Sequence, residues 1–322
     1  MKGKKTLFAA VGTAFFVAAA ILVGVLIKNK TSNDIVKMVA AYEYAQASSI
    51  MDVIKEEKLF EKYLPGNVEI EWTSIDSGSD RRDALAAGRV SVAMLETTKA
   101  IPAIEKGYPI ILLANGSKSM SGVYTVDPNI QKPEDLKGKT VAYQGAKDIV
   151  FKSDMSRNFG ITFSDEQFRA VGEADLISLL VTNQVNAAIL TNTMVEKAEE
   201  LNSNVRLVRD LTEETEYVGI ANWFLGNSDF FSEHPDLLEP VMHAYRDAVD
   251  EINNDLDHIA ELLSPLFNMT EEQIKREFTT FPASVEIYGY DRMAEILYQY
   301  GYLDAPAKPF EQLSNYESIP KK

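Results

Sequence analysis

Two segments of the chain align without a gap: Leu85–Thr98, LAAGRVSVAMLETT, and Leu180–Thr193, LVTNQVNAAILTNT. In each, a helical run stops at a residue that tolerates the left-handed conformation, Gly88 or Asn183, and a short apolar strand follows. The aligned threonines at the end of each segment are typical of a helix start. The same helix–strand–helix unit therefore occurs twice, which predicts two α/β lobes of one design.

Short apolar runs and helical spacing alternate outward from these two units. The first alternation begins with a strand near Ile35 and a helix at Ala47–Tyr63, and the second begins with a strand at Lys139–Tyr143. Extended segments near Val126 and Gly219 carry the chain from the first alternation to the second and back again. The pattern after residue 235 is almost wholly helical. We predict that lobe 1 comprises residues 33–126 and 220–322 with the C-terminal helices, and lobe 2 residues 127–219, joined by a two-segment hinge.

Residues 1–30 carry five lysines and no acid, and Leu7–Ile27 has no charged residue. A signal-peptide core spans roughly 7–15 residues whereas a transmembrane helix needs about 20. Length therefore favours a membrane anchor over a cleaved signal, although the small residues Ala18–Ala20 keep cleavage open. The lysines before the apolar run predict an extracytoplasmic folded part, anchored at the outer face of a bacterial cytoplasmic membrane.

The composition excludes several classes of function. Of the 322 residues, 46% are hydrophobic and 25% charged, as in ordinary globular proteins, and the net charge of −16 disfavours nucleic acid as a partner. The sequence has no cysteine, which excludes disulfides, thiolate metal sites and a cysteine nucleophile. It also lacks a phosphate-binding loop and a nucleophile elbow. We predict no cofactor, no metal and no catalytic residue.

Several short motifs follow one another in the order that one protein family shows. Pro133–Ala142, PEDLKGKTVA, resembles the DLKGKxVA that opens the second lobe across binding proteins, and Asp83–Val90, DALAAGRV, resembles the family's ALxxGxxD helix end. KLFEKYLP, IEKGYP and NQVNAA match further motifs at Lys58, Ile104 and Asn183. The set resembles solute-binding proteins of the nitrate/sulfonate/taurine and thiamine-precursor (NMT1-like) family. Ser91 and Asn186 replace the family's aspartates, and we interpret both changes as structural.

The resemblance implies a periplasmic-binding-protein fold of the second type. It also implies the substrate-binding component of an ABC importer, which would deliver a small molecule to a permease driven by an ATPase, and we expect a monomer. The ligand classes implied are small sulfonates, nitrate-like anions and pyrimidine precursors of thiamine. An enzyme on the same fold, such as a chorismate dehydratase-like or pyrimidine-synthase-like protein, is the alternative, and the sequence offers it no catalytic motif.

Ligands of α/β sheets bind beyond the carboxyl ends of the strands, so the segments after the predicted strands should line a cleft between the lobes. The candidate ligand-binding residues in these segments, or on the return crossing, are Tyr42, Glu43, Tyr44, Gln46, Asp76, Ser77, Glu96, Thr97, Thr98, Tyr143, Gln144, Gly145, Glu173, Thr191, Asn192, Asn222 and Trp223.

Acidic and aromatic side chains dominate these candidate segments, which also contain Asp148 and no arginine. A tightly bound sulfonate would favour arginine, whereas carboxylates and flat rings suit a ligand with N–H donors or a positive charge. We therefore expect a nitrogen heterocycle or an amine-bearing solute slightly ahead of sulfonate or nitrate. Helix N-termini in the same segments suit an anion, and Ser77, Thr97 and Thr98 are also explained as helix caps.

Overall fold

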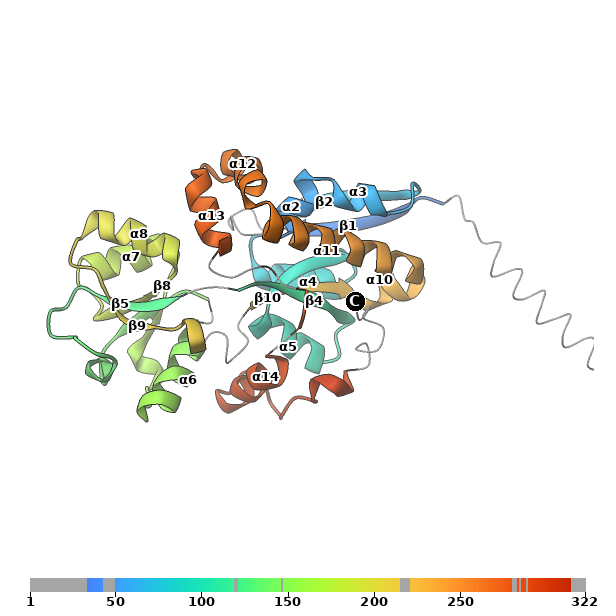
Figure 1. The fold of residues 1–322 in the computed structure, drawn as a ribbon. Helices are drawn as coiled ribbons and strands as arrows, with labels where there is room; N and C mark the ends of the chain where they lie inside the picture. The colour runs from blue at the N-terminus through green and yellow to red at the C-terminus, as the bar shows by residue number, and fades with distance from the viewer. Residues whose placement is uncertain are drawn as a thin grey trace, which may run out of the picture. The chain divides into compact units, whose positions relative to one another are not determined.

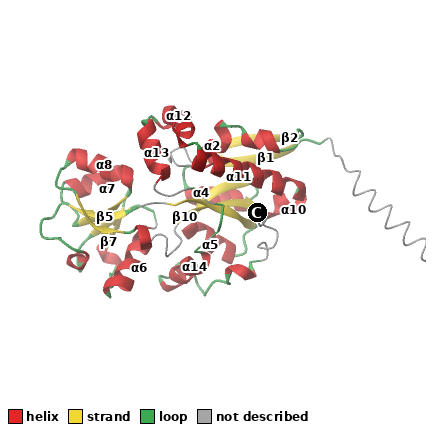
Figure 2. Cartoon of the chain, viewed as in Figure 1, coloured by secondary structure: helices red, strands yellow, loops and turns green. Residues whose placement is uncertain are grey.

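The computed structural model describes residues 34–42, 50–118, 121–145, 147–214, 221–279, 283, 285–287 and 289–313. Strands in this part of the chain form two mixed sheets of five, and helices flank them (Figure 1, Figure 2). This arrangement confirms the predicted α/β fold with two sheets. The membrane anchor predicted at Leu7–Ile27 lies outside the described residues, and among those described no helix is long and apolar enough to cross a membrane.

Among the described residues, 34–37 and 67–69 form a small unit and the others a large one. In the small unit, the backbone N–H of Val36 donates to the carbonyl oxygen of Asn67 at 2.9 Å, and the Asn67 side chain donates to the carbonyl of Asp34 at 3.3 Å. The large unit contains both sheets except the first residues of two strands. The predicted lobe boundaries divide the chain differently and stay a prediction.

The first sheet has the strand order β2-β1-β3-β10-β4. Its strands are β1 Val36–Tyr42, β2 Val68–Ser74, β3 Val92–Glu96, β4 Ile110–Lys118 and β10 Ala221–Asn227. β1 and β3 are parallel, and β10 pairs antiparallel with both β3 and β4. Trp223 lies opposite Leu95 on one side and Asn115 on the other, so β10 is the strand that holds the two halves of this sheet together.

Helices cover both faces of the first sheet. They are α2 Ile50–Glu56, α3 Leu59–Tyr63, α4 Gly78–Ala86, α5 Thr97–Glu105, α10 Ser228–Glu233, α11 Leu238–Asn254 and α14 Tyr290–Gln299. α12 Leu256–Phe267 and α13 Glu271–Thr279 pack on each other, and α12 also packs on α2 and α11. Successive residues of β10 point to opposite faces. Trp223 stacks on Tyr290 of α14 with ring centroids 5.7 Å apart, and Phe224 stacks on Tyr245 of α11 at 4.4 Å, so α14 and α11 pack on opposite faces.

The second sheet has the order β7-β6-β8-β5-β9. Its strands are β5 Gly122–Thr125, β6 Val141–Tyr143, β7 Phe168–Ala170, β8 Ala187–Leu190 and β9 Arg206–Asp210, and its helices are α6 Lys147–Phe159, α7 Glu173–Val181 and α8 Asn192–Leu201. Here β5 takes the place that β10 has in the first sheet, antiparallel between β8 and β9. The two sheets thus share one plan.

The structure confirms the internal repeat. Gly88 and Asn183 both have left-handed backbones, with φ of 67° and 57°. The two departures from the family pattern also have equivalent structural roles. The Ser91 hydroxyl accepts from the backbone N–H of Val39 at 3.2 Å, and the Asn186 amide oxygen accepts from that of Thr140 at 2.9 Å. Each side chain therefore ties the turn after the helix to the neighbouring strand or its approach.

Two elements differ from the sequence-based expectation. The helix predicted at Ala47–Tyr63 is two short helices, α2 and α3, because Lys58 adopts a left-handed conformation with φ of 54° and ends the first helical run. The segment Gly122–Thr125, which the predicted boundary assigned to lobe 1, is strand β5 of the second sheet. The apolar alternation of that segment indicates a strand, but does not indicate the sheet in which it pairs.

Replacing Gly116 by alanine should destabilise the first sheet. A Cβ atom at this position would overlap the Met94 side chain and the carbonyl oxygen of Asn222 in β10, so the strand backbone would have to shift. We expect Gly116→Ala to lower the free energy of unfolding by about 1–3 kcal/mol in a denaturant titration. Gly66→Ala is the control, because a Cβ there has no neighbour within 4 Å. Equal effects of the two changes would contradict this account.

Candidate functional site

The carboxyl ends of β1, β3 and β4 meet at one edge of the first sheet, because β1 and β3 are parallel and β10 runs antiparallel to both β3 and β4. The end of β2 joins them, since the backbone N–H of Ile75 donates to the carbonyl of Tyr42 at 3.1 Å. Strand β10 begins at the same edge, where Asn222 lies opposite Glu96. The structure therefore brings together Tyr42, Asp76, Ser77, Glu96, Thr97, Thr98, Asn222 and Trp223.

Helices α4 and α5 start at this edge, directly after β2 and β3. Ser77 is the N-cap of α4, and its hydroxyl accepts from the backbone N–H of Asp80 at 3.3 Å, which confirms the capping interpretation for this residue. The capping interpretation of Thr97 and Thr98 is wrong, because these threonines are the first two residues of α5 and not its N-cap. Its N-cap is Glu96, without a side-chain cap, and Thr97 is buried.

The remaining candidates belong to the second sheet or lie outside the described residues. Tyr143 is the last residue of β6, and Gln144 and Gly145 follow it; Gly145 is exposed with a φ of 68°. Glu173 is the first residue of α7, and Thr191 is the N-cap of α8, which starts at Asn192. Glu43, Tyr44 and Gln46 are not among the described residues.

Two of the acids at the strand ends are paired with lysines. Glu96 forms an ion pair with Lys99 in the first turn of α5. Asp148 is 2% exposed, and burial raises the pKa of its carboxyl group although Lys152 lies 3.2 Å away and opposes the shift. Among the described residues no group of three or more histidines or acids is arranged to bind a metal ion. The lysines therefore offset part of the negative charge that the sequence places at the strand ends.

Arg81 is a residue of this edge that the sequence analysis missed. It is 2% exposed, and its guanidinium donates to the carbonyl oxygens of Met94, at 3.1 Å, and Ile75, at 2.6 Å. It thereby joins α4 to the ends of β2 and β3. The sequence carried one signal, because Arg81 shares the buried face of α4 with Ala84 and Leu85 at helical spacing.

Trp223 and Asn115 lie side by side at the same edge, and both are fully buried. The ring of Trp223 packs on Tyr290 in the core, so it offers no open aromatic surface. Asn115 was not predicted, although it directly follows the apolar run Pro109–Ala114 and so stands at the carboxyl end of the strand expected there. Each side chain therefore places polar atoms in the protein interior, the amide group of Asn115 and the indole N–H of Trp223.

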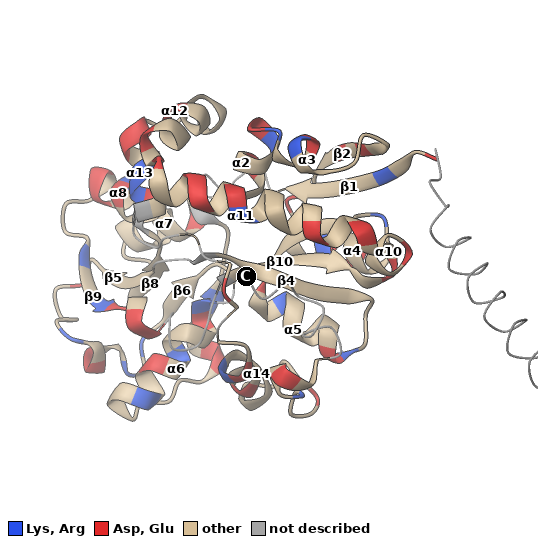
Figure 3. Ribbon diagram, turned by 45° about the vertical axis from the view of Figure 1, so that its right-hand side comes forward, with Lys and Arg blue, Asp and Glu red and all other residues tan. Residues whose placement is uncertain are grey.

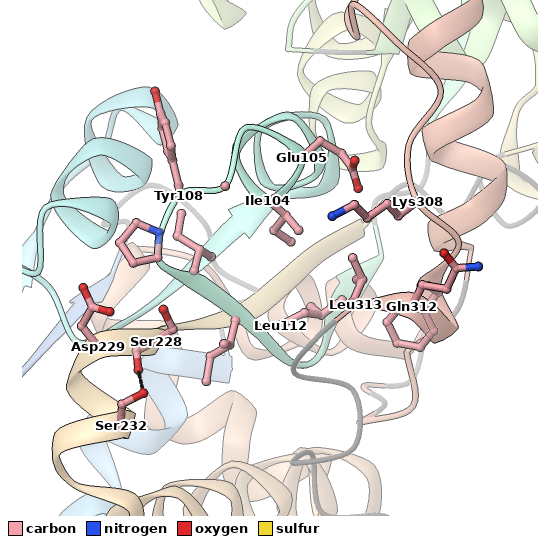
Figure 4. Close-up of a pocket in the computed structure, with 15 residues that line it drawn as sticks. Ile104, Glu105, Tyr108, Leu112, Ser228, Asp229, Ser232, Lys308, Gln312 and Leu313 are labelled. Atoms are coloured by element: carbon pink, nitrogen blue, oxygen red, sulfur yellow. Dashed lines mark hydrogen bonds between the residues drawn. The ribbon is translucent and has the colours of Figure 1, made fainter.

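A cavity of about 540 Å³ opens at the opposite edge of the first sheet. Figure 4 shows it beneath the end of α5 and the C-terminal segment, with the carboxylate of Glu105 and the ammonium group of Lys308 turned toward each other. Its lining residues are Ile104, Glu105, Gly107, Tyr108, Pro109, Ile110, Ile111, Leu112, Ser228, Asp229, Ser232, Lys308, Phe310, Gln312 and Leu313. The strand carboxyl ends and the starts of α4 and α5, where this fold binds ligands, lie at the other edge.

Solved structures similar to this chain have the periplasmic-binding-protein fold. The periplasmic aliphatic sulphonate binding protein of Escherichia coli matches with a TM-score of 0.71 and 17% identity, covering 84% of this chain and 95% of its own. The alkanesulfonate-binding protein of Xanthomonas axonopodis, bound to MOPS, matches with 0.69 and 17%, covering 85% and 96%. The periplasmic nitrate-binding protein of Synechocystis matches with 0.64 and 13%, covering 89% and 86%. The chain therefore has the two-sheet fold of periplasmic binding proteins.

The NMT1/THI5-like family model matches residues 66–257, more than half of the sequence, and the chain belongs to this family. The match confirms the resemblance noted in the sequence, and together with the neighbouring structures it supports a binding protein rather than an enzyme. No curated protein matches the sequence.

Replacing Arg81 by lysine should weaken the fold at the edge of the first sheet. A lysine ammonium cannot reproduce the planar set of donors that serves the Met94 and Ile75 carbonyls, so at least one buried carbonyl loses its partner. We expect Arg81→Lys to lower the free energy of unfolding by about 1–3 kcal/mol. Arg82→Lys is the matched control, because Arg82 is partly exposed and pairs with the adjacent Asp83. A denaturant titration in which both variants match the unmodified protein would contradict the assigned role.

Proposed function

We propose that this chain is the extracytoplasmic substrate-binding component of an ABC importer, and that it captures a small organic solute at the carboxyl edges of its sheets. The observation that carries the proposal is the convergence at one edge of Glu96, Thr98, Asn222 and Trp223 with the starts of α4 and α5. The family assignment and the sulphonate- and nitrate-binding neighbours support the same function. A permease and an ATPase are then its partners.

The solute that we propose is a nitrogen heterocycle or an amine-bearing molecule. Glu96 is about two-thirds buried, and its ion pair with Lys99 leaves further lone pairs on the carboxylate for an N–H donor of a solute. The guanidinium of Arg81 is already engaged by main-chain carbonyls, so it is not free to clamp a sulfonate in the bidentate manner that arginine favours.

A sulfonate or nitrate is the second candidate. The two sulphonate-binding neighbours favour it, as do the free N–H groups at the starts of α4 and α5. The two classes differ in one requirement, because an anion with only acceptor atoms gains nothing from the carboxylate of Glu96, whereas a donor-bearing solute does. A change at Glu96 therefore separates them.

Glu96→Gln should weaken binding of a donor-bearing solute. We would measure the thermal midpoint of the full chain in detergent with aminopyrimidines, small amines, alkanesulfonates and nitrate. A solute at 100 times its dissociation constant should stabilise the protein by about 2.7 kcal/mol, which raises the midpoint visibly. For an aminopyrimidine or amine we expect Glu96→Gln to reduce this shift, because the amide has lost one acceptor oxygen and the charge.

Glu105→Gln is the matched control, since Glu105 ends the same helix that Glu96 caps and lines the cavity at the opposite edge. We expect the solute-induced shift to be unchanged in this variant. A loss of binding in Glu105→Gln but not in Glu96→Gln would move the site to that cavity. A sulfonate hit that Glu96→Gln strengthens would replace the proposed solute class and keep the importer function.

We further propose that the two lobes close around the solute by a hinge at the crossings between the sheets. The first crossing lies between the end of β4 at Lys118 and the start of β5 at Gly122, and the second lies between β9 and β10. Solute would favour the closed form because only there do residues of both sheets contact it.

Labels on the two lobes should approach each other when solute binds. The chain has no cysteine, so Lys106→Cys and Glu200→Cys, both at exposed positions, give a pair for distance measurement by fluorescence transfer. We expect the distance to shorten with solute, and the distance between Arg169→Cys and Glu200→Cys, both in the second lobe, to stay constant. An unchanged distance in the first pair at saturating solute would rule out hinge closure.

A further inference from the structure

Asn115 of β4 has a buried side-chain amide without a hydrogen-bond partner. The residue is 0% exposed, and neither Nδ2 nor Oδ1 is hydrogen-bonded to any described residue. Its backbone is satisfied, because the N–H donates to the carbonyl of Val285 at 3.3 Å and the carbonyl accepts from the hydroxyl of Tyr245 at 2.5 Å. The unmet hydrogen-bonding capacity is therefore confined to the side chain.

Trp223 carries a second unpartnered polar atom next to this amide. It lies directly opposite Asn115 on β10, and directly opposed residues of an antiparallel pair place their side chains on the same face. Trp223 is 0% exposed, and its indole Nε1–H has no acceptor among the described residues. Two neighbouring side chains thus present two kinds of donor and one acceptor on one face, at the edge where the strands end.

Such an arrangement destabilises a protein that has no other use for it. A buried polar group without a partner loses its hydrogen bonds to water and gains none in return, so native structures contain few such groups. Leucine at position 115 has as many side-chain heavy atoms as asparagine, phenylalanine at position 223 keeps an aromatic ring, and neither carries this cost. Polar groups that lower stability in a fold but lie at its ligand-binding edge are typical of a site whose partner is the ligand.

We propose that Asn115 and Trp223 form a hydrogen-bonding subsite that selects solutes with an amide-like edge, in which an N–H donor stands beside an acceptor atom. The primary amide of Asn115 pairs with such an edge through two parallel hydrogen bonds, as asparagine does with the edge of adenine. The Trp223 N–H serves a further acceptor of the same solute. This inference rests on the function proposed above and narrows the class of solute.

The acceptor atom of Asn115 is what excludes simple anions. A sulfonate or nitrate has only acceptor atoms, so it satisfies Nδ2 and the Trp223 N–H but leaves Oδ1 buried, unpartnered and close to negative charge. The conclusion is the same for either orientation of the amide, because each orientation contains one oxygen. A ligand without a donor leaves this oxygen unpaired, and it therefore loses more binding affinity than a ligand that lacks one methyl group in an apolar pocket.

The test uses pairs of probes that differ by one donor. We would measure binding of 4-aminopyrimidine against 4-methylpyrimidine, nicotinamide against methyl nicotinate, and methanesulfonate and nitrate, to the full chain by calorimetry. We expect the donor-bearing member of at least one pair to bind, and at least about tenfold more tightly than its partner. Asn115→Leu should remove this preference. Trp223→Phe, which retains the stacking on Tyr290, should lower the affinity for the probe several-fold.

The thermal midpoints of the solute-free variants provide a second readout that needs no ligand. We expect Asn115→Leu to have a midpoint equal to or above that of the unmodified chain, because it removes an unsatisfied buried amide and keeps the number of side-chain heavy atoms. Trp223→Phe also shortens a buried side chain and leaves space behind, so this variant is judged by probe binding alone. Asn158→Leu, on α6 of the second lobe, is the control that should leave probe binding unchanged. A lower midpoint for Asn115→Leu would show that its amide serves the fold, through an enclosed water for example, and would overturn the inference.

The remaining outcomes separate this inference from the proposed function. Binding of methanesulfonate or nitrate that Asn115→Leu leaves unchanged would retain the importer function and overturn the subsite. Failure of the chain to distinguish the members of either pair would overturn the subsite as well. Failure of the wider thermal screen to find any solute would count against the binding function itself.

Discussion

The antiparallel strand β10 occupies the place between β3 and β4, and the first sheet depends on this pairing. Without it the parallel strands β1 and β3 have no connection to β4, since β10 supplies the hydrogen bonds on both sides. The same strand contributes side chains to the packing on both faces of the sheet, because Trp223 packs against α14 and Phe224 packs against α11 on the opposite face. Strand β5 has the equivalent place in the second sheet, so one constraint, applied twice, organises the molecule.

The repeated unit was predictable because its signals are local. A glycine or an asparagine after a helical run identifies a left-handed stop, and Gly88 and Asn183 both have that backbone. The strand ends could be located for the same reason, so the edge that collects Glu96 and Asn222 follows from the alternation of strands and helices. Periodicity within about ten residues is enough to give this much of the fold.

The chemistry of the edge was less predictable because it depends on neighbours far apart in the chain. That Trp223 is buried and lies beside Asn115 follows from the pairing of β10 with β4, which no local pattern reveals. Arg81 was overlooked because its partners are main-chain carbonyls at the ends of β2 and β3. Every residue has such a carbonyl, so the sequence does not indicate which of them accept a hydrogen bond from an arginine. Nor does a count of acids show that Glu96 and Asp148 have lysines one turn away. The surplus of acids is instead carried by helix surfaces such as those of α11, α13 and α14 (Figure 3).

The position of β10 also has a consequence for a chain that is still being made. All strands of the second sheet come from the continuous stretch between Gly122 and Asp210, so this sheet has every strand as soon as that stretch has emerged. Four strands of the first sheet emerge earlier, yet β10, which joins β3 to β4, is not synthesised until residues 221–227. The part of the molecule that begins first is therefore completed last, and until then the edges of β3 and β4 that later pair with β10 are open to other strands.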